Sequence, residues 1–312
     1  MPVTVSVIDS YKNFGKCVRI ENGTVEAIVT IDMGPRVLKY SFIGGENVFF
    51  TDDDRVFNIT SPEIDGAFGE GSVYCIAGGH RLWTSPEDAV HSYCPDNDPV
   101  EYELTPVGAI FTPAPQKGTK LQHSMELRMA DEGTNVTVLT GVVNFSGVPQ
   151  VFAPWNITQC APGGVEILPF SRKETGLLPD RQMTIWPYTD MNDPRVFFGN
   201  DYITLRQDSN ISDKFKVGIN NRAGWAAYIN AGNCFVKRYR HNESGAYPDF
   251  GVSYETFTNN LFIELETITE LSRVPVGGSL MGMEVWELIK CGGIKNPRDE
   301  AEISAFVKDL KL

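Results

Sequence analysis

The sequence predicts an all-β protein, an antiparallel β-sandwich with one short C-terminal helix. Two observations carry this prediction. Short runs of alternating apolar and polar residues follow one another along the chain, separated by turn-forming residues, and only the last segment has helical spacing. The length of 312 residues suits one large sandwich, and no repeat or linker interrupts the chain. We therefore expect a single domain over residues 1–312.

The N-terminal third is predicted to form β-hairpins. Residues 3–8, 24–31 and 37–42 alternate or are rich in β-branched side chains, and Asn22-Gly23 and Gly44-Gly45 mark turns between strands. The same texture recurs over residues 122–129, 135–143, 151–158, 202–205, 215–219, 225–229, 234–240, 261–267 and 282–289. Because short turns connect most of these runs, we expect the sheets to be antiparallel.

Two segments depart from the strand pattern. Residues 46–99 are rich in Asp, Gly, Ser and Pro, which predicts long loops over the rim of a sheet. Residues 295–312 carry Asn296-Pro297, then acidic residues and finally lysines, the order that complements a helix dipole. This C-terminal helix is expected to pack through an apolar stripe of Ile303, Phe306, Val307 and Leu310.

The net charge is −13, from 40 acidic and 27 basic residues, and it opposes binding to nucleic acid or to an anionic membrane. No run approaches 18 apolar residues, and residues 1–20 lack the apolar core of a signal peptide, so we expect a cytoplasmic protein. A phosphorylated ligand would need a basic cluster, which Lys237, Arg238 and Arg240 could supply.

Cofactor and metal signals are weak throughout the sequence. The six cysteines lie far apart without a C-x-x-C pair, and we interpret them as free thiols. Dinucleotide, P-loop, serine-hydrolase and zincin motifs are missing, and no His or carboxylate pair has a specific metal-ligand spacing. The sequence therefore predicts neither a cofactor nor a metal ion.

The strand at residues 262–267 carries two carboxylates, Glu264 and Glu266, two positions apart. Side chains at i and i+2 share one face of a strand, so Ile263 and Leu265 would face the core while both glutamates face water or a wet cleft. Two interpretations stay open: a solvated strand face, or a carboxylate pair whose members raise each other's pKa and suit one of them for proton transfer.

A second candidate segment, residues 78–87, contains Gly-Gly followed by His80, Arg81, Trp83 and Glu87. Two glycines let the backbone turn sharply, which would present an imidazole, a guanidinium and an indole together. These groups suit sugars, because polar donors bind hydroxyls and an aromatic plane covers the C–H face of the ring. The alternative is a turn with a packed tryptophan and a salt-bridged arginine.

Further candidate ligand-binding residues are Trp155, Lys237, His241 and Asp249. Trp155 shares a strand face with Ile157 and Gln159, and this pattern is more typical of a core strand than of a binding site. Lys237 lies in a run of basic residues, which is equally typical of an edge strand whose charges prevent pairing with another chain.

These residues together resemble the galactose-mutarotase-like superfamily, and more closely a branch of it whose members are uncharacterised. The resemblance rests on G-P-R-V at residue 34, G-G-H-R-L-W at 78, W-N-I-T at 155, N-N-L-F-I-E-L-E-T at 259, and E-V-W at 284. It implies a β-supersandwich that binds a small-molecule sugar. It also implies that Glu266, within Leu-Glu-Thr, is the general base, with Glu264 as the second choice.

The family's middle-strand histidine has no counterpart, because the sequence reads Trp155-Asn156-Ile157 there. His80 or His241 would have to act as the acid. Three hypotheses follow: an aldose 1-epimerase-type isomerase, a sugar-binding protein that has lost the acid, or hydrolysis or elimination by Glu264, Glu266 or Glu87. We expect His80, Trp83, Glu264 and Glu266 to line one concave surface.

Overall fold

Two large antiparallel sheets make up the computed structural model, which describes residues 2–312. The first sheet has eleven strands: β1 (Thr4–Ile8), β2 (Cys17–Glu21), β3 (Val25–Thr30), β4 (Val37–Phe42), β7 (Gly79–Ser85), β12 (Gln150–Cys160), β21 (Ile263–Ile268), β20 (Tyr254–Thr258), β17 (Phe215–Ile219) and β14 (Met183–Ile185) in spatial order, with β22 (Ser272–Val274) paired to β12. The second has ten: β15 (Val196–Phe198), β16 (Tyr202–Arg206), β13 (Val165–Pro169), β18 (Trp225–Asn230), β19 (Asn233–Tyr239), β23 (Ser279–Lys290), β11 (Val136–Asn144), β10 (Leu121–Met129), β9 (Gly108–Thr112) and β8 (Glu101–Thr105). The all-β prediction is confirmed.

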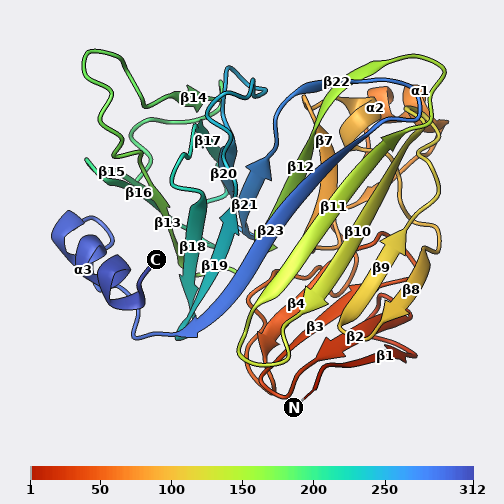
Figure 1. The fold of residues 1–312 in the computed structure, drawn as a ribbon, viewed down its shortest axis with the longest axis horizontal. Helices are drawn as coiled ribbons and strands as arrows, with labels where there is room; N and C mark the ends of the chain where they lie inside the picture. The colour runs from red at the N-terminus through yellow and green to blue at the C-terminus, as the bar shows by residue number, and fades with distance from the viewer. Residues whose placement is uncertain (1) are drawn as a thin grey trace.

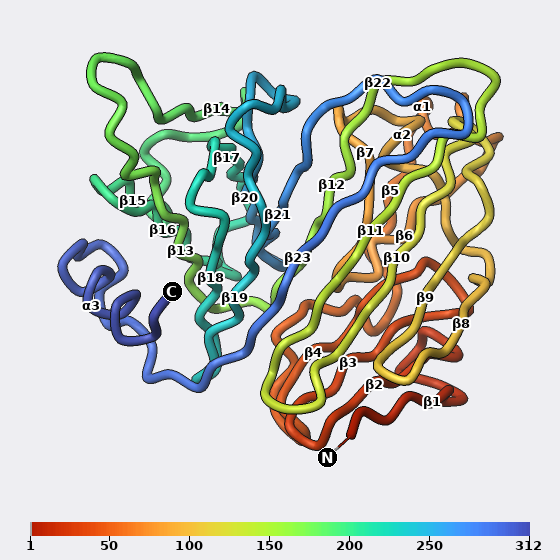
Figure 2. The backbone as a smooth tube through the Cα atoms, viewed as in Figure 1, coloured from red at the N-terminus to blue at the C-terminus, as the bar shows by residue number. Residues whose placement is uncertain are grey.

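The long strand β23 links two groups of strands in the second sheet (Figure 1). It pairs with β11 on one side and with β19 on the other. Early strands, β1 to β4 and β8 to β11, lie on one side of the molecule, and β13 to β20 lie on the other (Figure 2). In the first sheet β12 and β21 are neighbours although more than a hundred residues separate them in sequence.

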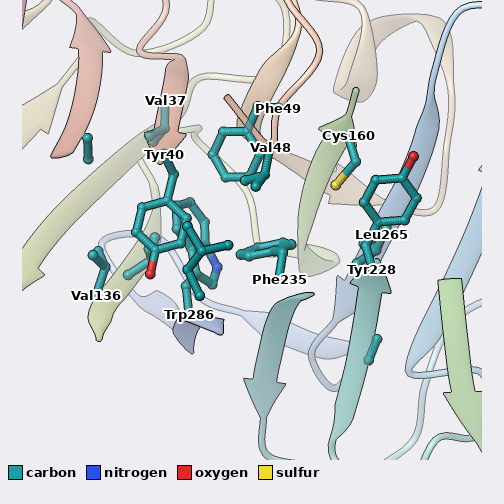
Figure 3. Packing of buried hydrophobic residues seen from close by; sticks show 14 of the residues in the cluster. Val37, Tyr40, Val48, Phe49, Val136, Cys160, Tyr228, Phe235, Leu265 and Trp286 are labelled. Carbon is teal, nitrogen blue, oxygen red and sulfur yellow. The ribbon is translucent and has the colours of Figure 1, made fainter. Parts of the chain in front are cut away.

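The main core lies between the inner faces of the two sheets. Aromatic side chains fill its centre, where Tyr40, Phe49, Phe235 and Trp286 pack together (Figure 3). The Phe49 and Trp286 rings meet edge to face, with their centroids 5.4 Å apart, a favoured geometry for aromatic pairs. Leu265 of β21 joins this core, which shows that the odd-numbered residues of β21 point inward.

Within residues 2–312, three short helices accompany the sheets: α1 (Pro62–Phe68), α2 (Ala89–Ser92) and α3 (Glu300–Leu310). The C-terminal helix is confirmed: Asp299 caps α3 by accepting hydrogen bonds from the backbone N–H groups of Ala301 and Glu302. Ile303 and Val307 are buried against Tyr202 and Trp225, so α3 covers the outer side of the second sheet. No helix within residues 2–312 is long and apolar enough to span a membrane.

The predicted loop region, residues 46–99, departs from expectation. It contains α1, α2, the small sheet of β5 (Asn58–Ile59) and β6 (Tyr74–Cys75), and the strand β7, which lies between β4 and β12. Gly78 and Gly79 have positive φ, and a Cβ on Gly79 would lie 2.1 Å from the carbonyl oxygen of Val37. Glycine therefore allows the close backbone approach that starts β7.

Candidate functional site

Strand alternation gathers polar side chains on the outer face of the first sheet, the side turned away from the second sheet. Cross-strand register aligns Glu266 of β21 with Ile157 of β12, and Ile157 with Arg81 of β7. Since directly paired residues point to the same side of a sheet, Arg81, Trp83, Trp155, Gln159, Glu264 and Glu266 share this face. We call these residues, together with Lys216 and Glu255 described below, the outer-face cluster.

Glu266 lies at the centre of the outer-face cluster and has no solvent exposure. Its Oε2 accepts hydrogen bonds from Trp155 Nε1 at 2.9 Å and from Lys216 Nζ at 3.0 Å. Its Oε1 is buried without a partner among the described residues. Burial raises the pKa of Glu266 well above its ordinary range; Lys216 opposes this shift and the Glu264 charge adds to it.

Glu264 lies one step nearer to solvent on the same strand face. Its Oε1 accepts hydrogen bonds from Gln159 Nε2 at 2.8 Å and from Arg81 Nη2 at 3.2 Å. The Arg81 guanidinium also covers the Trp83 ring, with 4.4 Å from its Cζ to the ring centroid. Arg81 Nε and Nη1 are buried and unpartnered, so this arginine keeps unused donors beside an indole.

Lys216 and Glu255 complete the centre of the outer-face cluster. Glu255 of β20 is directly opposite Glu266, a like-charge pair that would be unfavourable alone. Lys216 Nζ lies 2.8 Å from Glu255 Oε2, and it also sits 4.8 Å from the ring centroids of both Trp155 and Trp186. The ammonium group therefore holds two buried carboxyl groups and is itself enclosed by two indoles.

The charges in this cluster shift one another's protonation. Burial raises the pKa of Glu255 to about 7; Lys216 counteracts the shift, and the neighbouring Asp249 carboxylate reinforces it. Burial alone would lower the pKa of Lys216, but the charges of Glu255 and Glu266 outweigh burial and raise it well above its usual value. The site thus combines a charged lysine with carboxyl groups that can hold a proton near neutral pH.

The segment that follows β14 covers the cluster. Trp186 lies over Lys216, and Thr189 Oγ1 donates a hydrogen bond to the Lys216 backbone oxygen at 2.6 Å. Nearer to solvent, the Tyr93 hydroxyl donates to Glu87 Oε1. Glu266 is therefore fully buried beneath this cover, while Glu264 keeps a small exposed area.

Comparison with solved structures relates this architecture to known proteins. A galactose mutarotase-like protein from Lactobacillus casei aligns with 88% of this chain and 100% of its own, with a TM-score of 0.55 and 11% identity. A second one, from Clostridium acetobutylicum, aligns with 92% of this chain and 98% of its own, with a TM-score of 0.51 and 11% identity.

The chain has the galactose mutarotase-like fold. A TPR-domain containing protein from Parabacteroides distasonis also matches, at a TM-score of 0.59 and 13% identity over 91% of this chain, but this chain spans only about half (49%) of that protein. No protein-family model matches the sequence, and no curated protein resembles it significantly. At such low identity the likeness concerns the fold.

On this mutarotase-like fold, seven of the candidate residues predicted from the sequence lie on or beside the outer face: Glu264, Glu266, Arg81, Trp83, Trp155, Glu87 and Asp249. Three others do not: His80, Lys237 and His241. His80 and Lys237 occupy strand positions whose side chains point inward, and His241 lies in the turn after β19.

The expectation that His80 and Glu266 share one surface is wrong. His80 pairs with Thr158, whose side chain points inward, and its Nδ1 lies 2.9 Å from Thr158 Oγ1. The imidazole is fully buried against Trp286, with 4.8 Å between ring centroids. Burial lowers the pKa of His80 well below its ordinary value, and the positive charge of Lys237 adds to this effect. The sheet itself separates His80 from the glutamates, because β7 is a strand and not the expected loop.

Lys237 and His241 also lie away from the cluster. Lys237 is buried between the sheets, with Nζ 3.0 Å from Glu284 Oε1 and 2.8 Å from the Leu265 backbone oxygen. His241 Nδ1 lies 2.8 Å from Ser253 Oγ, and its ring stacks on Tyr247. Neither residue contacts the outer-face glutamates.

Sequence reasoning missed Lys216, Glu255 and Gln159 as site residues. The available signal was a charged residue inside an otherwise apolar strand, as in Phe-Lys-Val at 215–217 and Tyr-Glu-Thr at 254–256. A buried charge in a sheet needs a partner, but no local spacing identifies it, because Lys216 and Glu266 are 50 positions apart.

Proposed function

We propose that the outer-face cluster binds a free monosaccharide and interconverts its anomers, as an aldose 1-epimerase does, with Glu266 as the general base. The observation that carries this proposal is the state of the Glu266 carboxyl group: Oε2 is held by Trp155 and Lys216, while Oε1 is buried and free to accept a proton. A raised carboxyl pKa suits proton transfer near neutral pH. The fold shared with mutarotase-like proteins supports the same choice.

Lys216 is the proposed general acid in place of the missing histidine. In the forward step Glu266 takes the proton of the anomeric hydroxyl, the bond from C1 to the ring oxygen breaks, and the Lys216 ammonium protonates that oxygen. The open-chain aldehyde rotates about C1–C2, and the reverse transfers close the ring on the other face. Each residue regains its starting protonation state, so one turnover needs no co-reactant.

Recognition of a neutral sugar is favoured by the chemistry around Glu266. Arg81, Gln159 and Glu264 supply donors and acceptors for hydroxyl groups. Carboxylates outnumber cations on this face, and the inward-facing Lys237 cannot balance a phosphate here. The proposed substrate is therefore an unphosphorylated aldose.

A second candidate is a protein that binds sugar without turning it over. Two observations favour it: Glu266 has no solvent exposure, and the two imidazoles expected as the acid bond elsewhere, His80 to Thr158 and His241 to Ser253. The two candidates predict the same ligand and differ only in the rate of anomer exchange.

The test follows anomer exchange of several freshly dissolved α-aldoses by polarimetry, with sugar binding measured in parallel by thermal shift. We expect acceleration by the wild type and a loss of about 10²-fold or more in Glu266→Gln, with little change in affinity. Glu264→Gln is the matched control, because it removes the same charge from the same strand face. Equal rates in wild type and Glu266→Gln contradict the base assignment, and binding without acceleration by the wild type selects the second candidate.

A further inference from the structure

A short turn of the chain covers the outer-face cluster. It follows β14, the three-residue strand that ends the first sheet beside β17 (Figure 1). In this turn the Thr189 N–H donates a hydrogen bond to the Trp186 carbonyl oxygen at 3.0 Å. Pro187 occupies the second position, where its fixed φ suits a β-turn. The turn is therefore stiff within itself, and a movement of it has to occur at its two ends.

The chain is fixed on both sides of this turn. Before it, Ile185 is paired with β17. After it, Asp193 is buried and forms an ion pair with Arg195, with 2.7 Å between Oδ2 and Nη2. Residues 186–192 therefore form a strap between two anchored points.

Few contacts hold this strap down. Within residues 2–312, its hydrogen bonds to other parts of the chain both involve Thr189 Oγ1, which accepts from the Lys216 N–H at 3.1 Å and donates to the Lys216 backbone oxygen at 2.6 Å. Its large side chains lie outside the main core, with Trp186 half-buried and Tyr188 45% exposed. Segments with few buried contacts open locally at a small cost in free energy.

The neighbours of the Lys216 ammonium group show why the strap has to open. Nζ lies 2.8 Å from Glu255, 3.0 Å from Glu266, and 4.8 Å from the ring centroids of both Trp155 and Trp186. Glu255, Glu266 and Trp155 belong to β20, β21 and β12, each of which is paired on both sides. A general acid has to come within about 3 Å of the oxygen that it protonates. Trp186 is the neighbour that can make room for a substrate, because it lies on the strap.

We propose that residues 186–192 form a gate over the outer-face cluster, which Thr189 holds shut. Opening moves Trp186 away from Lys216 and admits the sugar, and Trp186 then closes over the sugar as an aromatic surface for its C–H groups. Trp186 is thus a substrate-contacting residue, and Thr189 is a positioning residue. This inference rests on the proposed function, because a gate is needed only if a sugar has to reach Glu266.

Opening of the gate can be measured without sugar, by amide hydrogen exchange of the full chain at low urea concentrations. The Lys216 amide is protected by Thr189, whereas the next amide, that of Val217, points to the other side of β17, towards β20. We expect Lys216 to exchange about 10²-fold faster than Val217 or more, at a rate that urea does not change, because local opening exposes little new surface. Equal exchange rates with the same dependence on urea overturn the gate.

The role of Thr189 is tested by the matched variants Thr189→Val and Thr184→Val. Both remove a hydroxyl that donates to a backbone oxygen, but Thr184 lies in β14, before the gate, and donates to Asp249 at 2.9 Å. Binding of D-galactose and D-glucose is followed by stopped-flow tryptophan fluorescence. Without its two hydrogen bonds the gate opens more often, so Thr189→Val should bind and release sugar about tenfold faster, with little change in Kd. Thr184→Val should keep the wild-type rates. Unchanged rates in Thr189→Val overturn the proposal.

The role of Trp186 is tested by Trp186→Ala and Trp186→Phe. Alanine should raise the Kd for sugar about fivefold, and phenylalanine, which keeps an aromatic surface, should restore most of the affinity. Equal affinities in the wild type and both variants contradict the contact between Trp186 and the sugar. Failure of the proposed function gives a different result: if no aldose binds, or if Glu266→Gln keeps the wild-type rate, the epimerase assignment is wrong, and the exchange of the Lys216 amide still decides whether the gate opens.

Discussion

Replacement of Lys216 by methionine tests the electrostatics of the outer-face cluster directly. The substitution keeps an unbranched side chain between Trp155 and Trp186 and removes the ammonium group that lies 2.8 Å from Glu255 and 3.0 Å from Glu266. Removing one partner of a buried ion pair typically costs about 3–5 kcal/mol, because the remaining charge is left uncompensated. We expect a loss of unfolding free energy of about this size at pH 8.

The pH dependence of that loss distinguishes electrostatics from packing. In the wild type the folded-state pKa of Glu255, about 7, lies above its ordinary value of 4.5. Between these pH values the folded protein keeps a proton that the unfolded chain has released, so stability falls as pH rises through this window. Without Lys216 both carboxyl groups should hold their protons to higher pH, and the fall should continue above pH 7.

At pH 5, where both carboxyl groups of Lys216→Met can be neutral, the loss should shrink to about 1 kcal/mol, the scale of the lost cation–π contacts. The assay is urea denaturation of wild type and variant at pH 5 and pH 8. Lys214→Met, a nearby exposed position, is the control and should stay within about 0.5 kcal/mol of wild type. Adding Glu266→Gln should recover part of the loss at pH 8. Equal losses at pH 5 and pH 8, or no recovery, would refute the reasoning.

Two further predictions concern parts of the fold away from the site. Burial raises the pKa of Glu166 to about 8, although hydroxyl groups of Thr256 and Tyr254 donate to it at 2.5 Å. Glu166 should therefore make wild-type stability fall by a few kcal/mol as pH rises from 4.5 to 8, at about 1.4 kcal/mol per pKa unit. Glu166→Gln lacks this contribution and keeps that of Glu255, so its stability should fall less steeply than that of the wild type; an equal fall in both proteins would contradict the prediction. Ile303→Ala should lower the free energy of unfolding by about 2–5 kcal/mol, because the Ile303 side chain is fully buried where α3 packs on the second sheet. A thermal unfolding midpoint equal to that of the wild type would contradict this role of Ile303.

Local patterning was enough to predict much of this protein. The alternation at residues 262–267 places Glu264 and Glu266 on one face and Leu265 in the core, as the structure has them. Asn22-Gly23 forms the turn between β2 and β3. Asn22 Oδ1 accepts hydrogen bonds from the backbone N–H groups of Thr24 and Val25. The stripe of α3 is also as predicted. Each of these features depends on the side-chain period of a single element, which is a local property.

Non-local pairing decided the composition of the site. The amino-acid content of residues 46–99 predicted loops around His80, but two glycines allow β7 to join the first sheet. Because successive side chains of a strand alternate between its faces, the imidazole then points away from Glu266. Lys216 lies 50 positions before Glu266, and only the sheet order, which places β17 beside β20, brings its ammonium group to both glutamates; Glu255 lies on the strand directly before β21. A sequence determines which side chains of a strand share a face, whereas the charges that meet across strands depend on which strands become neighbours.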